Sequence, residues 1–430
     1  MGLAFPLETR RLANGLAVVA SPDRTLPVVG LTVLYRVGSR QERPGRSGFA
    51  HLFEHLMFEG TPRSAKGLFD RVCEASGGQN NGQTRPDATV YVATAPASAL
   101  ERLLWLEADR MSALAFSEET LATQRDVVKE EIRANVQNDP YGLFEFQEVP
   151  RLLFERWDSA HDAYGDFADL DAATLDDVKA FFAAHYRPNN AVLAVAGDVE
   201  PEALFDVAER LFGAIPPGEL PERPDLREIP RPSPAVEVSE APLAETPALC
   251  AGWRMPPSAH PDAWPLLVLG ELLHDGRSGR LFRGLVEGRE IATEVWGGFN
   301  PFQGGVSYEG TTSFLTKVAY RRGVGHADVL RAIEAEVDRV LHEGVGEDEL
   351  ARVRTKVVSG YLSAVESRLE RSLEIAQAVA FCGRAESVNE LPERVAAVTS
   401  ENLSRAARRW LAPEARAVVV KRPPEKEARG

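Results

Sequence analysis

The chain has 430 residues, of which 44% are hydrophobic and 26% are charged, a mixture that is typical of globular proteins and excludes a fibrous or low-complexity chain. At roughly 100–200 residues per domain, this length predicts two to four domains. Acidic residues outnumber basic ones, 64 to 49, which gives a net charge of −15. An acidic surface repels phosphates and attracts basic peptides, so we expect no nucleic-acid partner.

Cysteine usage and hydropathy bear on the compartment. The three cysteines, Cys73, Cys250 and Cys382, form no CxxC pair, which indicates a reducing environment or core packing rather than a disulfide framework. Charged residues interrupt every early apolar run, so the first thirty residues predict no signal peptide. No window holds 18 uninterrupted apolar residues, and we expect no membrane span. These features favour the cytoplasm, with the periplasm as the alternative if a signal peptide has been removed.

Strands and helices follow one another irregularly in the N-terminal half. The predicted strands cover 16–21, 28–37 and 89–94, and the predicted helices cover 49–58, 97–111 and 118–137. This order lacks the strict strand–helix–strand alternation of a doubly wound sheet. The pattern therefore predicts an α+β fold.

A proline-rich stretch divides the chain. Residues 216–234 contain seven of the 29 prolines, and such a segment forms neither a helix nor a central strand. We therefore predict an N-terminal domain at 1–215, a linker at 216–234 and a C-terminal domain at 235–430.

The two predicted domains resemble each other. Thr174 and Thr399 each precede a helical pattern, with a side-chain acceptor three residues later and a proline fourteen residues later, before a Val-rich strand. Threonine is a favoured helix N-cap, and proline stops a helix. The segments 31–40 and 248–257 are also alike, since each is an apolar strand that runs into an aromatic residue and an arginine. The repetition predicts two tandem homologous domains; the alternative is that many α+β domains end in a helix and a strand.

The run GFAHLFEHLMFEG at 48–60 carries a group of residues that suggests metal chemistry. Its apolar residues predict a buried helix. On that helix His51, Glu54 and His55 share one face, and residues four apart lie close enough for two imidazoles to bind one ion. Zinc accepts histidine nitrogen and takes three protein ligands plus water at many catalytic sites, and Glu54 would reach that water as a general base. The alternative is a buried His–Glu–His hydrogen-bond network, which is costly without an ion.

A third ligand is expected from the helical pattern at 117–137. Its inward stripe runs through Leu121 and Val128, and helical periodicity puts Glu131 at the edge of that stripe and Glu130 on the solvated face. Glu131 is therefore the better candidate for a metal ligand. The alternative for Glu131 is a partly buried salt bridge.

The order HxxEH, with glutamate directly before the second histidine, inverts the HExxH of thermolysin-like zincins and is the inverzincin pattern. Glu131 follows His55 by 76 positions, in VVKEEIR. With this spacing the sequence resembles the M16 peptidase family, which includes pitrilysin, insulin-degrading enzyme and the mitochondrial processing peptidase. The runs GGQNNGQTRPDATVY (77–91) and AHYRPNNAVLAVAGD (184–198) extend the resemblance over the first domain.

The resemblance implies a hydrolase, and more closely a zinc metalloprotease that holds one Zn2+ per chain and cleaves extended or unfolded peptides inside a chamber formed with a partner subunit. It implies that His51, His55 and Glu131 bind zinc and that Glu54 is the general base. The implied fold is the M16/LuxS-like metallohydrolase fold, in which each of two domains has a mostly antiparallel mixed sheet with helices packed on one face. The C-terminal domain contains no HxxEH and is expected to lack a metal site.

By the same resemblance, a strand at the edge of the first sheet binds an extended substrate through β-augmentation. The residues of this strand that we expect to contact substrate are Asn80, Asn81, Gly82 and Thr84. Gly82 stands where the family usually has alanine. The alternative is that 77–84 is only a hairpin turn.

Further departures from the family bear on activity and partners. Gln124, seven residues before Glu131, stands where relatives often have a glutamate that orients a ligand. Active single-chain or homodimeric relatives carry LRxxxxxxY in the second domain, and the run that starts at Leu285 has Val286 and Thr293 at the Arg and Tyr positions. We predict a heterodimer with a homologous M16 subunit that lacks HxxEH and supplies Arg and Tyr, with a homodimer as the alternative. The competing function is a metal-binding, weakly active subunit that holds peptides or scaffolds a complex.

Other features are expected to be structural. His185 is predicted at a strand edge, and His274 is predicted to pack or to face solvent. The segment 345–380 combines mixed charges with an apolar stripe, which predicts one long helix with a solvated face.

Overall fold

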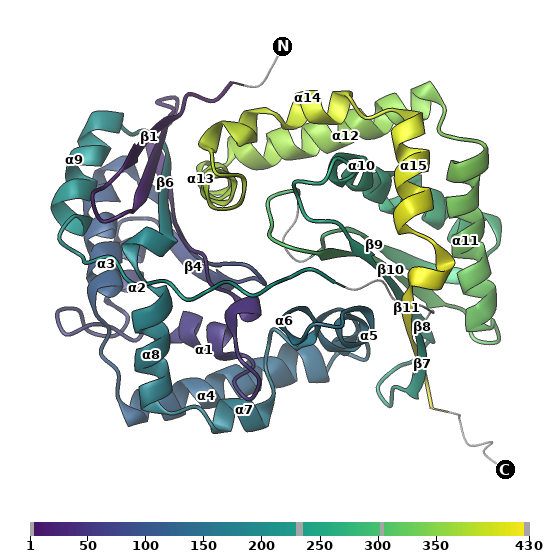
Figure 1. Cartoon of the computed structure of the whole chain (residues 1–430), viewed down its shortest axis with the longest axis horizontal. Helices are drawn as coiled ribbons and strands as arrows, with labels where there is room; N and C mark the ends of the chain where they lie inside the picture. The colour runs from purple at the N-terminus through teal and green to yellow at the C-terminus, as the bar shows by residue number, and fades with distance from the viewer. Residues whose placement is uncertain (1–3, 229–234, 302–304, 425–430) are drawn as a thin grey trace. The chain divides into compact units, whose positions relative to one another are not determined.

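The computed structural model describes residues 4–228, 235–301 and 305–424. The chain forms two compact units, each assembled from three separate segments (Figure 1). Unit 1 comprises Met1–Lys129, Ala163–Pro224 and Ser359–Pro392, and unit 2 comprises Glu130–Asp162, Asp225–Val358 and Glu393–Gly430. Each unit therefore receives one segment from the opposite half of the chain.

The proline-rich stretch contains one of the points at which the chain passes between units, after Pro224. Residues 216–228 hold no helix or strand, and 229–234 lie outside the described residues. Proline accounts for this irregularity, because its ring fixes φ and removes an N–H donor. The exchange of the segments 130–162 and 359–392 is a feature that composition does not indicate.

Unit 1 is built on a six-stranded sheet with the order β1-β2-β6-β3-β5-β4. Its strands are β1 (Glu8–Arg11), β2 (Ala17–Pro22), β3 (Val28–Tyr35), β4 (Gln79–Thr84), β5 (Thr89–Pro96) and β6 (Ala191–Gly197). Neighbours are antiparallel except β2 and β6, which run parallel. β4 lies at one end of this order, and its one partner among the described residues is β5. The predicted mostly antiparallel mixed sheet is confirmed.

Successive side chains of a strand point to opposite faces of the sheet. The two faces of this sheet are covered by different parts of the chain. On β3, Tyr35 packs against Tyr186 with ring centroids 4.6 Å apart. Thr32 points to the opposite face, where its hydroxyl hydrogen-bonds Ser372 of α13 (Arg368–Gln377) at 2.7 Å. Figure 1 shows α13, near the yellow end of the colour scale, beside the purple and blue strands. A helix from the C-terminal half thus covers the second face, in addition to the helices predicted on the first.

Unit 2 contains a five-stranded sheet with the order β7-β11-β8-β10-β9. Its strands are β7 (Ala235–Glu240), β8 (Ala248–Met255), β9 (Ala292–Phe299), β10 (Thr312–Tyr320) and β11 (Ala417–Arg422). β7 and β11 are parallel and the other pairs antiparallel. The run β11-β8-β10-β9 repeats the order β6-β3-β5-β4 of unit 1, as expected for two tandem α+β domains. Phe144 and Val149, from the exchanged segment, share a buried cluster with Cys250 and Val419 of this sheet.

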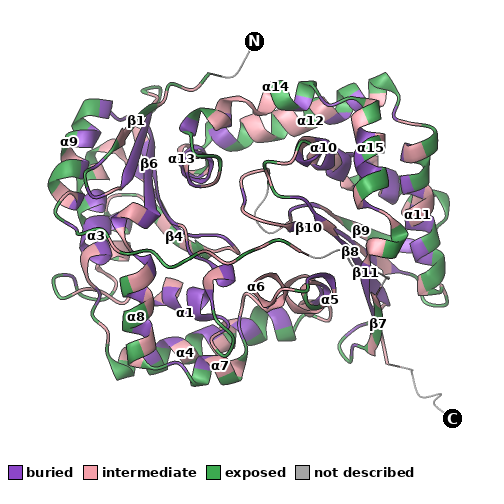
Figure 2. Cartoon of the chain, in the orientation of Figure 1, coloured by how far each residue is buried: buried purple, intermediate pink, exposed green. Residues whose placement is uncertain are grey.

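The helices surround the two sheets. Those of unit 1 are α1 (Phe49–Leu56), α2 (Leu68–Ala75), α3 (Leu100–Ser112), α7 (Phe167–Asp171), α8 (Leu175–His185), α9 (Pro201–Phe212) and α13. Those of unit 2 are α5 (Val149–Leu153), α6 (Trp157–Ala160), α10 (Ala263–His274), α11 (His326–His342) and α15 (Ser400–Trp410). The unit boundaries fall inside α4 (Glu118–Ile132), α12 (Glu347–Glu366) and α14 (Leu391–Ala396). In Figure 2 the central strands are buried, and β6 is buried along its whole length.

Matching caps begin the helices α8 and α15, as the repeat predicts. The Thr174 hydroxyl accepts a hydrogen bond from the N–H of Asp177, whose carboxylate accepts one from the Thr174 N–H. Thr399 and Asn402 make the same reciprocal pair before α15. Each pair satisfies two N–H groups that a helix start would otherwise leave without acceptors.

The single helix predicted at 345–380 is wrong. α12 ends at Glu366, Ser367 is extended with ψ of 125°, and α13 begins at Arg368. The Ser367 hydroxyl caps the new helix by accepting from the N–H of Glu370. Serine offers the backbone an alternative to continued helix, which the 3.6-residue periodicity does not reveal.

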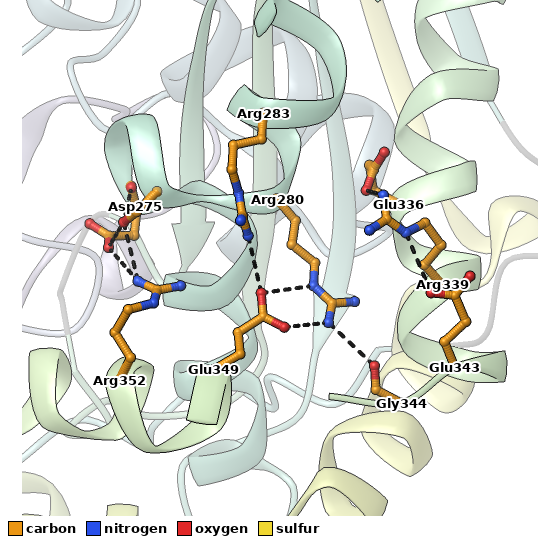
Figure 3. Close-up of polar contacts among 10 residues, drawn as sticks. Asp275, Arg280, Arg283, Glu336, Arg339, Glu343, Gly344, Glu349 and Arg352 are labelled. Atoms are coloured by element: carbon orange, nitrogen blue, oxygen red, sulfur yellow. Dashed lines mark hydrogen bonds and ion pairs between the residues drawn. The ribbon is translucent and has the colours of Figure 1, made fainter. Parts of the chain in front are cut away.

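Two arginines of the run GRSGRLFR (276–283) take part in ion pairs within unit 2 (Figure 3). Arg280, whose side chain is 8% exposed, holds Glu349 through two hydrogen bonds, of 3.2 and 2.6 Å. Arg283 pairs with the same carboxylate at 3.1 Å. Glu336, 1% exposed, is paired with Arg339 at 2.9 Å. These charges stabilise one another within unit 2, since each carboxylate faces at least one guanidinium.

Candidate metal centre

The start of helix α1 is capped by a side chain from outside the helix, because its own N-cap residue is a glycine. Its N-cap is Gly48, with φ of 77°, a left-handed value that favours glycine. Glu42 supplies the acceptors that a capping side chain would normally provide: its carboxylate oxygens accept from the N–H of Gly48 at 2.9 Å and of Ala50 at 2.7 Å. A carboxylate at a helix N-terminus is also stabilised by the helix dipole. Sequence reasoning missed Glu42, because it lies outside the helical pattern.

A second loop holds the same helix end. Gly165 approaches Gly48 so closely that a Cβ added at Gly165 would lie 2.4 Å from the Gly48 Cα. Ser47 donates its hydroxyl to Asp169 at 2.7 Å. Tyr164, beside these contacts, meets the ring of His51 edge-on with centroids 5.4 Å apart. Tyr164 was not predicted as a neighbour of the histidines, and the signal for it in the sequence is the adjacent Gly165.

α1 brings two histidines together on one face. His51 is buried, with 7% of its surface exposed, and His55 is half-buried. Their ring centroids are 5.0 Å apart and the rings are nearly perpendicular, at 78°. The spacing of four residues produces this approach, because one helical turn separates the two positions.

The third member of the group comes from α4. Ligand atoms of His51, His55 and Glu131 all lie within 4.8 Å of one another. Glu131 follows the buried Val128 on this continuous helix and is half-buried. Glu130 is exposed on the other side and pairs with Arg133. The structure thus brings Glu131, and not Glu130, to the two histidines.

The donor set fits zinc. Two imidazole nitrogens and a carboxylate are common zinc ligands with bonds of about 2.0–2.2 Å, so donors around one tetrahedral ion lie about 3.3 Å apart. Three donor atoms within 4.8 Å require only small side-chain rotations to reach that spacing. The burial of His51 also restricts access of water to this side of the group.

Glu54 belongs to the same helix as His51 and His55, and its side chain contacts strand β4. Its Oε2 accepts a hydrogen bond of 2.6 Å from the hydroxyl of Thr84. Gly82, two residues earlier on β4, leaves room for this carboxylate: an added Cβ there would lie 2.9 Å from both Cγ and Oε1 of Glu54. The side chain is therefore held against the edge strand.

The residues predicted to bind substrate lie on β4, which excludes the hairpin-turn alternative for 79–84. Asn80 donates its side-chain amide to Asp70 of α2 at 2.7 Å, and the Asn81 side-chain oxygen accepts from the N–H of Gly82 at 2.9 Å. Exposure alternates along the strand, so Asn81 lies on the face opposite to Gly82. The strand and its place at the sheet edge are structural findings; substrate contact stays a prediction.

Gln124 is hydrogen-bonded to the segment that follows α1. It is buried, and its amide donates to Glu59 Oε1 at 2.7 Å. Glu59 follows α1 and also pairs with Lys66 at 2.7 Å. A neutral amide is suited to this position because Glu59 already carries the negative charge.

Aromatic side chains form the base beneath α1. Phe53 packs on Tyr186 with centroids 4.4 Å apart, and the hydroxyls of Tyr186 and Tyr91 are 3.2 Å apart. Burial raises the pKa of both phenols, and the negative charge of Glu54 adds to the effect. Both tyrosines therefore stay neutral at ordinary pH.

The other histidines that the sequence analysis named have no part in this group. His185 ends helix α8, so its predicted place at a strand edge is wrong. His274 ends α10 and packs against Phe314, in agreement with the packing prediction. Burial lowers the pKa of each imidazole to about 4.

The positions expected to carry Arg and Tyr lie in unit 2. Val286 is part of a π-helical segment, Phe282–Gly288, and is half-buried. Thr293 is exposed on β9, where its hydroxyl donates to the carbonyl of Ala319 at 3.3 Å. Neither side chain offers a phenol or a guanidinium.

Two α+β units, with two histidines on one helix and a glutamate on another, form the arrangement of an inverzincin metallopeptidase. Two family models match the chain: "Insulinase (Peptidase family M16)" at residues 17–148 and "Peptidase M16 inactive domain" at residues 172–357. The chain belongs to peptidase family M16.

Named relatives belong to the same class. Zinc protease PqqE of Helicobacter pylori is 28% identical over 372 residues, which cover 84% of this chain and 80% of that protein. A zinc protease of Rickettsia bellii is 26% identical over 415 residues, covering 95% and 96%. The crystal structure of a protease from Helicobacter pylori matches with a TM-score of 0.90 at 25% identity, covering 98% and 100%. The first half of the periplasmic protease PqqL of Escherichia coli shares the fold, with a TM-score of 0.77 at 19% identity over 99% and 94%.

A membrane-crossing helix is not found in the described part of the chain, where no helix is both long and apolar enough to span a bilayer.

Proposed function

We propose that this chain is a zinc-dependent endopeptidase that hydrolyses extended or unfolded peptides. The observation that carries the proposal is the position of Glu54, which lies on the same helix as two of the three metal-binding candidates and is hydrogen-bonded to the sheet edge through Thr84. A base at this position would lie between a metal and a strand-like peptide.

His51, His55 and Glu131 would hold the ion. Zinc bound there would supply a Lewis acid for the scissile carbonyl. Glu54 takes the proton from the attacking water and delivers it to the leaving amine as the peptide bond breaks. The hydrogen bond from Thr84 keeps the carboxylate aimed during both transfers.

The edge strand is suited to an extended substrate. β4 has one neighbour, β5, among the described strands, so its outer N–H and C=O groups are available for main-chain pairing. Main-chain pairing makes few demands on substrate sequence, which fits a protease for unfolded peptides. Asn80, Asn81, Gly82 and Thr84 would line the bound peptide.

The partner belongs to the same proposal. A homologous M16 subunit without HxxEH would supply the Arg and Tyr that are replaced here by Val286 and Thr293, and would complete a chamber around the peptide. A homodimer is the alternative. The cytoplasm is the proposed compartment and the periplasm its alternative.

A metal-dependence experiment tests the activity. The full chain, alone and mixed with such a homologue, is assayed with an unfolded peptide before chelation, after chelation and after zinc is restored. Hydrolysis that disappears with chelator and returns with zinc supports the proposal. Hydrolysis that is insensitive to chelator contradicts it.

The second candidate is a metal-binding, weakly active subunit that holds peptides or scaffolds a complex. The absence of a phenol at position 293 and of a guanidinium at position 286 favours it. Zinc binding and peptide binding without hydrolysis, even with the partner present, would support this function over the first.

A further inference from the structure

The segment 164–169, which contains the loop before α7 and the first residues of that helix, is hydrogen-bonded to the start of α1 through Ser47. The Ser47 hydroxyl donates to Asp169 at 2.7 Å and accepts from the N–H of Asp166 at 3.0 Å. The Ser47 N–H donates to the same oxygen of Asp169 at 3.0 Å. Ser47 is buried, and all of these residues belong to unit 1. Three hydrogen bonds therefore join the segment to the helix start.

The backbones of the segment and of α1 are also in direct contact. Gly48 and Gly165 both have left-handed φ values, 77° and 93°. A Cβ added at Gly48 would lie 2.5 Å from the carbonyl oxygen of Tyr164, and one added at Gly165 would lie 2.4 Å from the Gly48 Cα. Only glycine fits at either position unless the backbone moves. This approach puts Tyr164 against the first turn of the helix that carries His51.

The side chain of Tyr164 contacts the imidazole of His51. The two rings are nearly perpendicular, at 86°, and their centroids are 5.4 Å apart. Edge-to-face rings with centroids about 4.5–7 Å apart attract each other. His51 is 7% exposed and also contacts His55 edge-on, with centroids 5.0 Å apart. Because protein interiors are closely packed, the imidazole of His51 can rotate only if these neighbouring rings move.

We propose that Tyr164 is a positioning residue that holds the His51 imidazole in the orientation for metal binding, an inference that rests on the proposed zinc site. A side chain that is free to rotate loses conformational entropy when it binds an ion, and this loss weakens binding. A ring fixed beside the imidazole restricts the rotation before the ion binds. The affinity of the site for zinc therefore depends on Tyr164, which acts through His51 and not as a ligand.

The contact with His51 is made by the ring of Tyr164, which determines the choice of variants. Tyr164→Phe keeps the ring and should bind zinc as the wild type does. Tyr164→Leu keeps an apolar side chain but removes the flat ring. Ser47→Ala leaves Tyr164 unchanged and loosens the segment, because it removes the hydroxyl contacts with Asp166 and Asp169.

Zinc competition experiments test the proposal. The Kd of the full-length chain for zinc is measured against a chromophoric chelator, and the unfolding midpoint of each variant is measured in excess chelator. We expect Tyr164→Leu to raise the zinc Kd by about 2- to 10-fold, the range of one aromatic pair, and Ser47→Ala to raise it as well. In the chain loaded with Co2+, the visible absorption bands report the coordination geometry. They should change in Tyr164→Leu and stay unchanged in Tyr164→Phe.

Tyr361→Leu is the matched control, because Tyr361 is another half-buried tyrosine of unit 1 and its hydroxyl donates to the carbonyl of Val388. This variant should lower the unfolding midpoint and keep the wild-type zinc Kd. A wild-type Kd in Tyr164→Leu, an equal rise in Tyr361→Leu, or a rise in Tyr164→Phe would overturn the positioning role and leave the zinc site intact. A wild-type chain that binds no zinc would overturn both.

Discussion

Thr84 donates a hydrogen bond of 2.6 Å to Glu54, which joins the last residue of the edge strand to the helix that carries the two histidines. The strand expected to pair with substrate and the proposed general base are therefore linked by one side chain. Because a carboxylate acceptor strengthens a hydrogen bond, this contact holds Glu54 in one orientation.

Replacement of Thr84 should disturb the orientation of the Glu54 carboxylate without affecting metal binding. We expect Thr84→Val to lower kcat by about 10-fold or more, since a hydrogen bond to a charged group contributes roughly 1.5–3 kcal/mol, while zinc content stays unchanged. Thr84→Ser retains the hydroxyl and should restore most of kcat. A valine variant with normal kcat would show that the hydrogen bond does not position the base.

Glu54→Gln should abolish peptide hydrolysis and keep the metal. The amide has the shape of the carboxylate but cannot take a proton from water. Zinc analysis and peptide assays on the same preparation check this prediction. Loss of zinc would identify Glu54 as a ligand instead, and wild-type turnover would contradict its role as base.

Glu131→Gln and Glu130→Gln form a matched pair on one helix. Glu131 lies with His51 and His55, so its neutralisation should lower zinc content well below one ion per chain, because an amide is a poorer zinc ligand than a carboxylate. Glu130 pairs with Arg133 on the surface, and its variant should keep zinc. Elemental analysis of both folded variants distinguishes the two positions.

The partner prediction concerns the activity of the isolated chain. Alone it should bind zinc but hydrolyse peptides about 10²–10³-fold more slowly than when mixed with a homologue that carries Arg and Tyr, the usual cost of one missing oxyanion donor. The double variant Val286→Arg, Thr293→Tyr should raise the activity of the lone chain. Full activity of the unmodified lone chain would exclude the heterodimer requirement.

Acid should destabilise the fold through His274. Its Nδ1 donates to the carbonyl of Gly270 at 3.1 Å, its Nε2 lies 3.0 Å from the Thr316 hydroxyl, and burial lowers its pKa to about 4. The unfolded chain binds this proton near pH 6.5 and the folded chain only near pH 4. The contribution of His274 to the free energy of unfolding is therefore fully present above pH 6.5. It is lost as the pH falls from 6.5 toward 4, by up to about 1.4 kcal/mol per pH unit.

Denaturant unfolding at pH 7.5 and pH 5, with chelator present throughout, measures this effect. The His274→Asn variant should lose less stability between the two pH values than the wild type does. The chelator removes any contribution from protonation of the metal ligands. An equal loss in both proteins would show that His274 does not carry the pH dependence.

Several features of the structure could be predicted from residues that lie close together in the sequence. His51 and His55 meet because four residues make about one helical turn, and no distant contact is needed for that. The caps at Thr174 and Thr399 also depend on groups three residues apart. The Ser367 break at the start of α13 was missed, although it is local, because a serine cap competes with a periodic pattern that continues on both sides.

The remaining features depend on tertiary packing, because packing brings together groups with no fixed separation along the chain. A helix with two histidines, a resemblance to one peptidase family and the candidate ligand Glu131 could all be recognised in the sequence. Folding was needed to bring Glu131 within 4.8 Å of the histidines, to put Glu42 at the start of α1 and to lay α13 against a sheet from the opposite half of the chain. Periodicity reports only which face of an element is apolar; which partner covers that face depends on the packing of the whole unit.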